Sequence, residues 1–154
     1  MLTAILRVLR DIAALVRTPV YRVGMVVPGI GTGLAYASGD AFGGKLVFHV
    51  PSEGTISNVT FLDYDDEGIV KELVLFDRDF TATADNAAMD VSVRNSLGVV
   101  PINEFFDLGG DRIGQGTPAL GYVVPDGMLY GQLVTRGADN IAAGAIPEIW
   151  LVIV

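Results

Sequence analysis

Two stretches in the middle of the chain, Ile56-Ser-Asn-Val-Thr-Phe-Leu-Asp63 and Val70-Lys-Glu-Leu-Val-Leu-Phe76, alternate apolar and polar residues. A period of two places every second side chain on the same face of a pleated strand, so the alternation is typical of strands with one buried face. Tyr64-Asp-Asp-Glu-Gly68 lies between them, and a polar segment that ends in glycine is typical of a turn. We therefore expect the two strands to form an antiparallel hairpin.

The chain beyond residue 18 contains further short strands separated by turn residues. Glycine and proline together account for 26 of 154 residues and interrupt nearly every apolar stretch. One short helical turn is expected at residues 85–90, where Asp85 would cap Ala87 and Ala88. The fold class predicted from this spacing is all-β, a jelly-roll-like β-sandwich. Its eight expected strands are residues 20–27, 45–50, 56–63, 69–76, 98–103, 120–124, 129–136 and 147–154.

The first residues differ in charge from the rest of the chain. Residues 1–22 hold four arginines against Asp11, a net charge of +3, whereas the other six basic and 17 acidic residues give residues 23–154 a net charge of −11. Pro19 follows this basic segment and marks a boundary. We expect two units, an N-terminal amphipathic helix or arm at residues 1–18 and a β-sandwich body at residues 19–154.

Apolar residues of the N-terminal segment recur at helical spacing and predict about four turns that end before Pro19. A signal peptide fits poorly because the arginines lie within the apolar stretch and no small-residue cleavage site follows. The helix either packs on its own body or docks on a partner, which would be another protein rather than an anionic membrane surface. Its predicted partner-binding residues are Leu2, Ile5, Leu6, Arg7, Leu9, Arg10, Ile12, Ala13, Val16 and Arg17.

Composition excludes several classes of function. The chain has no cysteine, which rules out disulfides, thiolate metal sites and cysteine nucleophiles. Its formal net charge of −8 disfavours binding to nucleic acid. Mean hydropathy is high, at +0.48, but the longest apolar run covers only residues 149–154, far short of the ~20 residues that span a bilayer, so no membrane is expected. The apolar surplus therefore goes into a core, into an interface or into both, and an apolar surface off the membrane usually indicates a partner.

Few residues suggest catalysis or metal binding. The run from Asp63 to Gly68 resembles the start of an EF-hand loop, but position 12 of such a loop is Val74 instead of a glutamate. The glycine-dense residues 29–33 match neither the dinucleotide-binding fingerprint nor the P-loop. They indicate a flexible connection or a close backbone approach. His49, the only histidine, and Trp150 both lie in apolar stretches, where a hydrogen-bonded structural histidine and a core strand are expected. We expect no catalytic residue, no metal and no cofactor.

Five segments, taken in order, resemble a family of tailed-bacteriophage virion structural proteins: Tyr36-Ala-Ser-Gly-Asp-Ala-Phe-Gly43, the strands at residues 56–63 and 73–76, Ala84-Asp-Asn-Ala-Ala88 and Leu129-Tyr-Gly-Gln-Leu-Val-Thr-Arg136. Members of that family are cement or decoration proteins of the capsid. The resemblance covers residues 20–154, and the N-terminal segment lies outside it.

The resemblance implies a non-enzymatic jelly-roll-like protein on the outer surface of the virion, bound to the major capsid protein shell at its subunit junctions. We also expect a homo-oligomer, a dimer or trimer, in which a terminal strand such as residues 147–154 pairs with a sheet edge. Two alternatives remain open from the residues alone. One is a receptor- or carbohydrate-binding module on the virion surface, and the other is a glycan hydrolase that uses a pair of carboxylates.

Overall fold

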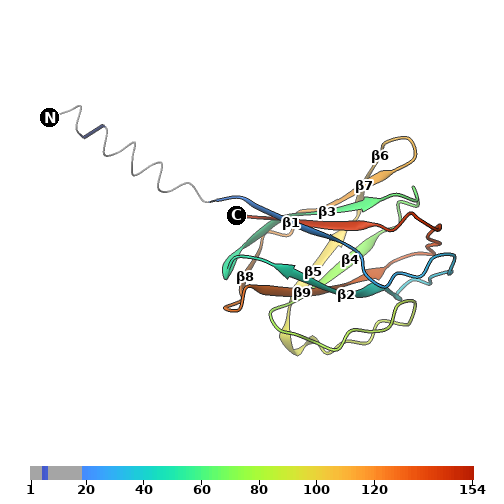
Figure 1. The fold of residues 1–154 in the computed structure, drawn as a ribbon, viewed down its shortest axis with the longest axis horizontal. Coiled ribbons are helices and arrows are strands. Elements are labelled where there is room, and N and C mark those ends of the chain that lie inside the picture. Colours follow the sequence, from blue (N-terminus) through green and yellow to red (C-terminus); the bar gives the residue numbers. More distant parts are fainter. Residues whose placement is uncertain (1–4, 7–18) are drawn as a thin grey trace.

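The computed structural model describes residues 5–6 and 19–154. Residues 19–154 form an all-β sandwich of two antiparallel sheets, and this part of the chain has no α-helix (Figure 1). The predicted N-terminal helix and its partner-binding residues lie outside the described residues, except for Ile5 and Leu6, which are both exposed. The elements are β1 (Tyr21–Val26), β2 (Ala41–His49), β3 (Glu53–Asp63), β4 (Lys71–Phe76), the 3-10 helix η1 (Val93–Asn95), β5 (Ser96–Ile102), β6 (Glu104–Asp107), β7 (Arg112–Gly116), β8 (Leu120–Val123), β9 (Met128–Thr135) and β10 (Glu148–Ile153).

The larger sheet has the strand order β1-β10-β3-β7-β6, with β8 paired to the first residues of β3. The smaller sheet has the order β2-β9-β4-β5. Because β1 and β10 pair from Tyr21 opposite Ile153 to Val26 opposite Glu148, the last strand ends beside the start of the first (Figure 1). All described pairings are antiparallel, and most connections cross from one sheet to the other.

The core lies between the sheets and is built from alternate residues of each strand. On β10, Ile149, Leu151 and Ile153 are buried, whereas the residues between them are only partly covered. Phe42 of β2 packs edge-on against Phe61 of β3, with ring centroids 6.1 Å apart. Each fully buried side chain of this size contributes ~1.5–3 kcal/mol through removal of apolar surface from water, so this layer of aliphatic and aromatic side chains is the main source of stability.

The hairpin predicted for residues 56–76 is wrong. β3 pairs with β7, β8 and β10 in the larger sheet, and β4 pairs with β5 and β9 in the smaller one. The intervening loop crosses the sandwich, and Asp63 holds its start by accepting hydrogen bonds from the backbone N–H groups of Asp65 and Gly68, at 3.1 and 2.8 Å. Alternation indicates only that a strand has one buried face. Two successive strands meet this condition whether they pair in a hairpin or belong to different sheets.

Three further expectations are corrected. The segment at residues 85–90 forms no helical turn, because the carboxylate of Asp85 accepts hydrogen bonds from distant groups instead of capping its own segment. Strands β6 and β7 are absent from the eight expected strands. The terminal strand β10 cannot pair with a free edge, because β1 and β3 occupy both of its sides.

Candidate functional site

The outer faces of the two sheets differ in how they are covered. Beyond β4, the chain folds over the outer face of the smaller sheet and buries a second apolar cluster there (Figure 1). The rings of Phe76 and Phe80 stack in this cluster, with centroids 4.1 Å apart. On the larger sheet the outward residues of the described strands remain exposed or only partly buried. The larger sheet therefore presents the open face of the body.

Strand register aligns apolar residues in a row across this open face. Val26 of β1 lies opposite Glu148 of β10, which lies opposite Leu62 of β3. Leu62 in turn lies opposite Ile113 of β7, which lies opposite Phe106 of β6. Both ends of the row are well exposed, Val26 at 54% and Phe106 at 53%. We call Val26, Leu62, Ile113 and Phe106 the outer row. Exposed apolar surface of this kind, here interrupted by Glu148 between Val26 and Leu62, is typical of interfaces.

An aromatic group adjoins the outer row around Glu148. The carboxylate of Glu148 accepts hydrogen bonds from the hydroxyl of Tyr64, at 3.2 Å, and from Nε1 of Trp150, at 2.9 Å. Burial, followed by the charge of Glu148, raises the pKa of Tyr64 above its ordinary value. Trp150 belongs to a strand as predicted, but its ring lies on the outer face instead of in the core, and the Arg22 guanidinium stacks 4.7 Å from the ring centroid.

Gly24 explains how that ring can lie flat on the sheet. A Cβ atom at Gly24 would overlap the atoms of the Trp150 ring, so no residue with a side chain fits there without moving the indole. The absence of a side chain at this position on β1 therefore lets the indole lean across the edge strand. Neighbours therefore contact both the polar edge and the face of the Trp150 ring.

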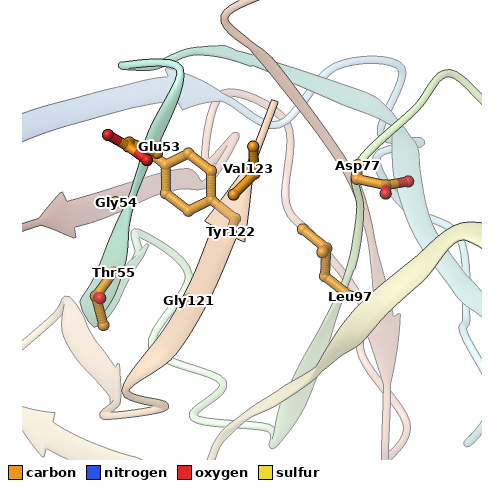
Figure 2. A pocket seen from close by; sticks show the side chains of 8 residues that line it. All are labelled: Glu53, Gly54, Thr55, Asp77, Leu97, Gly121, Tyr122 and Val123. Atoms are coloured by element: carbon orange, nitrogen blue, oxygen red, sulfur yellow. The ribbon is translucent and has the colours of Figure 1, made fainter. Parts of the chain in front are cut away.

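A shallow hollow of about 620 Å³ lies at one end of the sandwich. Figure 2 shows its lining, with Tyr122 and Val123 of β8 beside β3, and Leu97 and Asp77 on the other side. The Tyr122 hydroxyl and the Oδ1 atom of Asp77 are buried and have no hydrogen-bond partner in the described part of the chain. Burial raises the pKa of Tyr122.

The acidic residues that resemble an EF-hand loop are used inside the fold. Asp63 holds its own loop, Asp65 accepts from the backbone N–H of Ala142 at 2.8 Å, and Asp66 pairs with Arg112. Within residues 5–6 and 19–154, no three His, Asp or Glu side chains are grouped as metal ligands. In the same residues no helix has the length and apolar character needed to cross a membrane.

Two other expectations concern the glycine-dense loop and the histidine. The N–H of Gly33 donates to the carbonyl of Ile141 at 2.7 Å, and a Cβ atom at Gly29 would lie 3.8 Å from the backbone nitrogen of Gly44, so the predicted close backbone approach is confirmed. His49, expected to be a hydrogen-bonded structural residue, is instead exposed at the end of β2. The described part of the chain brings none of the residues singled out by sequence motifs together as a chemical site. The outer row escapes sequence reasoning because its members come from four separate strands.

Searches with this sequence give no matching family model and no matching curated protein.

Proposed function

We propose that this protein is a non-enzymatic virion structural protein of a tailed bacteriophage, a cement or decoration protein that binds and stabilises the shell of the major capsid protein from outside. The observation that carries the proposal is the outer row on the open face of the larger sheet. A monomer gains nothing from holding Phe106 and Val26 in water, whereas a bound shell would bury them at roughly 25 cal/mol per Å² before the cost of association.

The strand order supports the finer fold assignment, a jelly roll. If the β6-β7-β8 segment counts as one strand, the sheets read β1-β10-β3-β7 and β2-β9-β4-β5, in which most successive strands alternate between sheets, as in two Greek keys. Virion shells and lectins both use this architecture, so the fold favours a binding role without choosing between them.

The proposed mechanism is stabilisation by mass action. A protein that binds the assembled lattice better than free capsid subunits lowers the free energy of the assembled shell with every bound copy. The outer row would supply the apolar contact. The N-terminal arm, through the apolar side of its predicted helix and its arginines, would reach an acidic neighbouring surface.

Cosedimentation with purified particles of the encoding phage tests the proposal. Phe106→Asp should reduce the bound fraction at least tenfold, because a charge would be desolvated at the interface. Val99→Asp is the matched control, since Val99 is 52% exposed on β5, the edge strand of the other sheet. Equal binding by both variants, or absence of the protein from purified particles, would overturn the proposal.

The arm has a separate test. Leu9→Asp and a deletion of residues 1–18 should weaken attachment while the body stays folded. Full occupancy of particles by the truncated protein would show that the arm does not dock. Binding of the isolated protein to a glycan array, without binding to particles, would favour the carbohydrate-binding alternative.

A further inference from the structure

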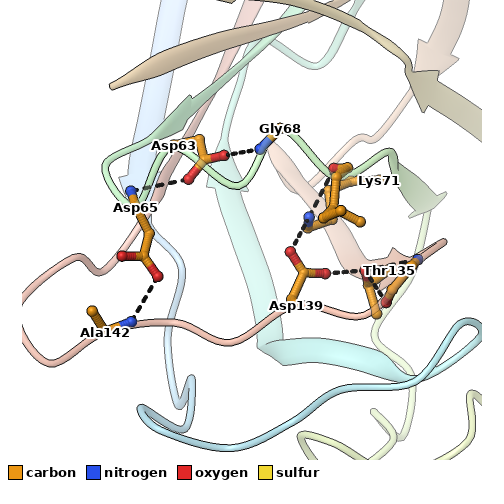
Figure 3. A network of polar contacts seen from close by, with 9 residues as sticks. Asp63, Asp65, Gly68, Lys71, Thr135, Asp139 and Ala142 are labelled. Atoms are coloured by element: carbon orange, nitrogen blue, oxygen red, sulfur yellow. Dashed lines mark hydrogen bonds and ion pairs between the residues drawn. The ribbon is translucent and has the colours of Figure 1, made fainter. Parts of the chain in front are cut away.

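A lysine and an aspartate are buried together between the sheets. Lys71 begins β4, and Asp139 lies in the connection from β9 to β10. The Nζ atom of Lys71 lies 2.8 Å from Oδ1 of Asp139, and both side chains are only 1% exposed (Figure 3). Lys71 also donates to the carbonyl of Ile69, at 2.8 Å. Full burial of an ion pair costs several kcal/mol of solvation for each ion, so such a pair calls for an explanation.

The surroundings of the pair are apolar on the lysine side and polar on the carboxyl side. The Nζ atom lies 4.7 Å from the ring centroid of Phe42 and 5.5 Å from that of Phe61. The hydroxyl of Thr135 donates to Oδ2 of Asp139, and the backbone carbonyl of Asp139 accepts from the N–H of Tyr36 at 3.0 Å. Side chain and backbone of Asp139 are therefore both held in place while the amine faces the carboxyl group.

Burial favours the neutral amine form of Lys71. It lowers the pKa of Lys71, and the charges of Asp139, Asp63 and Glu67 oppose that shift. Glu67, whose own pKa is raised by burial and then by Asp139, adds to the negative surroundings. Transfer of one proton from the ammonium to the carboxylate converts the buried ion pair into an amine and a carboxylic acid, which have no charge to desolvate.

We propose that Lys71 and Asp139 condense into an intramolecular amide that covalently links β4 to the connection between β9 and β10. After the proton transfer, the lone pair on Nζ attacks Cγ, the carbon bonded to Oδ1, and Oδ1 itself lies 2.8 Å from Nζ. The negative charge that develops on Oδ2 is stabilised by the Thr135 hydroxyl already bonded to it. One amine proton moves to Oδ1, the bond from Cγ to Oδ1 breaks, and water leaves. The ammonium and carboxylate together supply every atom, so no other reactant is consumed.

The chain contains its own comparison. Lys45 and Asp79 form an equally direct contact, but their side chains are 30% and 66% exposed. Because water solvates this exposed ion pair, no desolvation drives a proton from the ammonium to the carboxylate, and an ammonium has no lone pair with which to attack. The buried pair meets the requirements for condensation and the exposed pair does not, which makes Lys45–Asp79 a control in the same molecule. The inference does not depend on the proposed function.

Intact-mass spectrometry of the purified, denatured full chain is the test. The linked protein should weigh less than its sequence by one water molecule. Trypsin should fail to cut after Lys71, and should release a branched peptide that joins the segments around Lys71 and Asp139. A chain with the full sequence mass, cut normally after Lys71, would refute the proposal.

Two variants identify the reacting atom. Asp139→Asn should reach the same final mass as the linked unsubstituted protein, because the same amide forms with loss of ammonia instead of water. Asp139→Ala should keep the mass calculated from its sequence, whether or not it folds. A water loss that persists in Asp139→Ala, or a branch that maps to Lys45 and Asp79, would overturn the assignment.

Discussion

Asp85 joins three distant parts of the chain, and its replacement by alanine should be among the most damaging changes outside the core. Its carboxylate accepts from the N–H of Gly31 at 2.8 Å, from the N–H of Gly43 at 2.6 Å and from the hydroxyl of Tyr36 at 2.9 Å. These bonds tie the glycine-dense loop and the start of β2 to the long excursion that follows β4. No local sequence pattern reveals such a junction.

The cost of Asp85→Ala follows from the donors left behind. A part-buried donor that loses its acceptor costs ~1–3 kcal/mol, and the Tyr36 hydroxyl can fall back on the carbonyl of Gly31, at 3.3 Å. The N–H of Gly31 keeps only a longer contact, 3.2 Å to the Tyr36 hydroxyl, and the N–H of Gly43 has no other acceptor among the described residues, which gives a loss of about 3 kcal/mol in the free energy of unfolding. For a chain of this size, that corresponds to a decrease of roughly 6–12 °C in Tm.

Urea denaturation, followed by far-ultraviolet circular dichroism, measures this loss. Asp90→Ala is the matched control, because Asp90 is an exposed aspartate in the same excursion that bonds to Thr83 through its backbone and whose side chain forms no hydrogen bond with the described residues. The control should change the free energy of unfolding by less than about 0.5 kcal/mol. If both variants unfold at the same urea concentration, the three hydrogen bonds do not hold the junction together.

Three further predictions concern the body. Leu133→Ala, at a fully buried position on β9, should lower the free energy of unfolding by ~2–5 kcal/mol, which denaturant titration measures; a loss below about 1 kcal/mol would contradict its place in the core. Gly24→Ala should displace the ring of Trp150, the only tryptophan, so its fluorescence spectrum should change, and an unchanged spectrum would count against the close contact. Burial, and then Asp85, raise the pKa of Tyr36 above its ordinary 10.0. Because the folded state holds this proton more tightly, the stabilisation is present below about pH 10 and is lost as pH rises through the folded pKa. Tyr36→Phe should therefore lose less stability than the unsubstituted protein as the pH rises above about 10. If the free energy of unfolding of both proteins depends on pH in the same way, Tyr36 does not cause the decrease.

Local alternation predicts most strands because it depends only on one face being buried. It fails in the first half of β2, which contains Gly43, where a side chain would collide with Val27. Alternation also fails to predict β7, again because glycines occupy its inward positions. The inward positions of β7 are Gly114 and Gly116, whose Cβ atoms would collide with groups of neighbouring strands, so close packing of the sheets removes the apolar alternation that identifies a strand.

Pairing between distant segments cannot be predicted from the same patterns. Lys71 and Asp139 are 68 positions apart, and neither residue type nor spacing indicates that they meet. The hairpin error has the same origin, since the choice of neighbours for β3 and β4 is made by contacts with β9 and β10, late in the chain. A sequence indicates which face of a strand is buried, whereas register decides which side chains share that face.

The strand register shows where part of the apolar surplus of this acidic chain lies on the surface. Val26, Leu62, Ile113 and Phe106 never appear as one apolar run, yet they align across the larger sheet. Val26 is also the last residue of β1, a strand of roughly 20 Å that begins two residues after Pro19. A partner that covers the outer row would therefore contact the body roughly 20 Å from the start of β1.

Arm and row would then act as two linked contacts on one partner, in which the first contact raises the effective concentration of the second. Leu9→Asp and Phe106→Asp should each weaken binding to particles, and the double variant should bind less than either single variant. Residual binding by the double variant equal to that of Leu9→Asp alone would mean that the row contributes nothing once the arm is lost. If each contact alone were enough for attachment, both single variants would bind particles at normal occupancy. That result would contradict the proposal that the arm and the outer row act together.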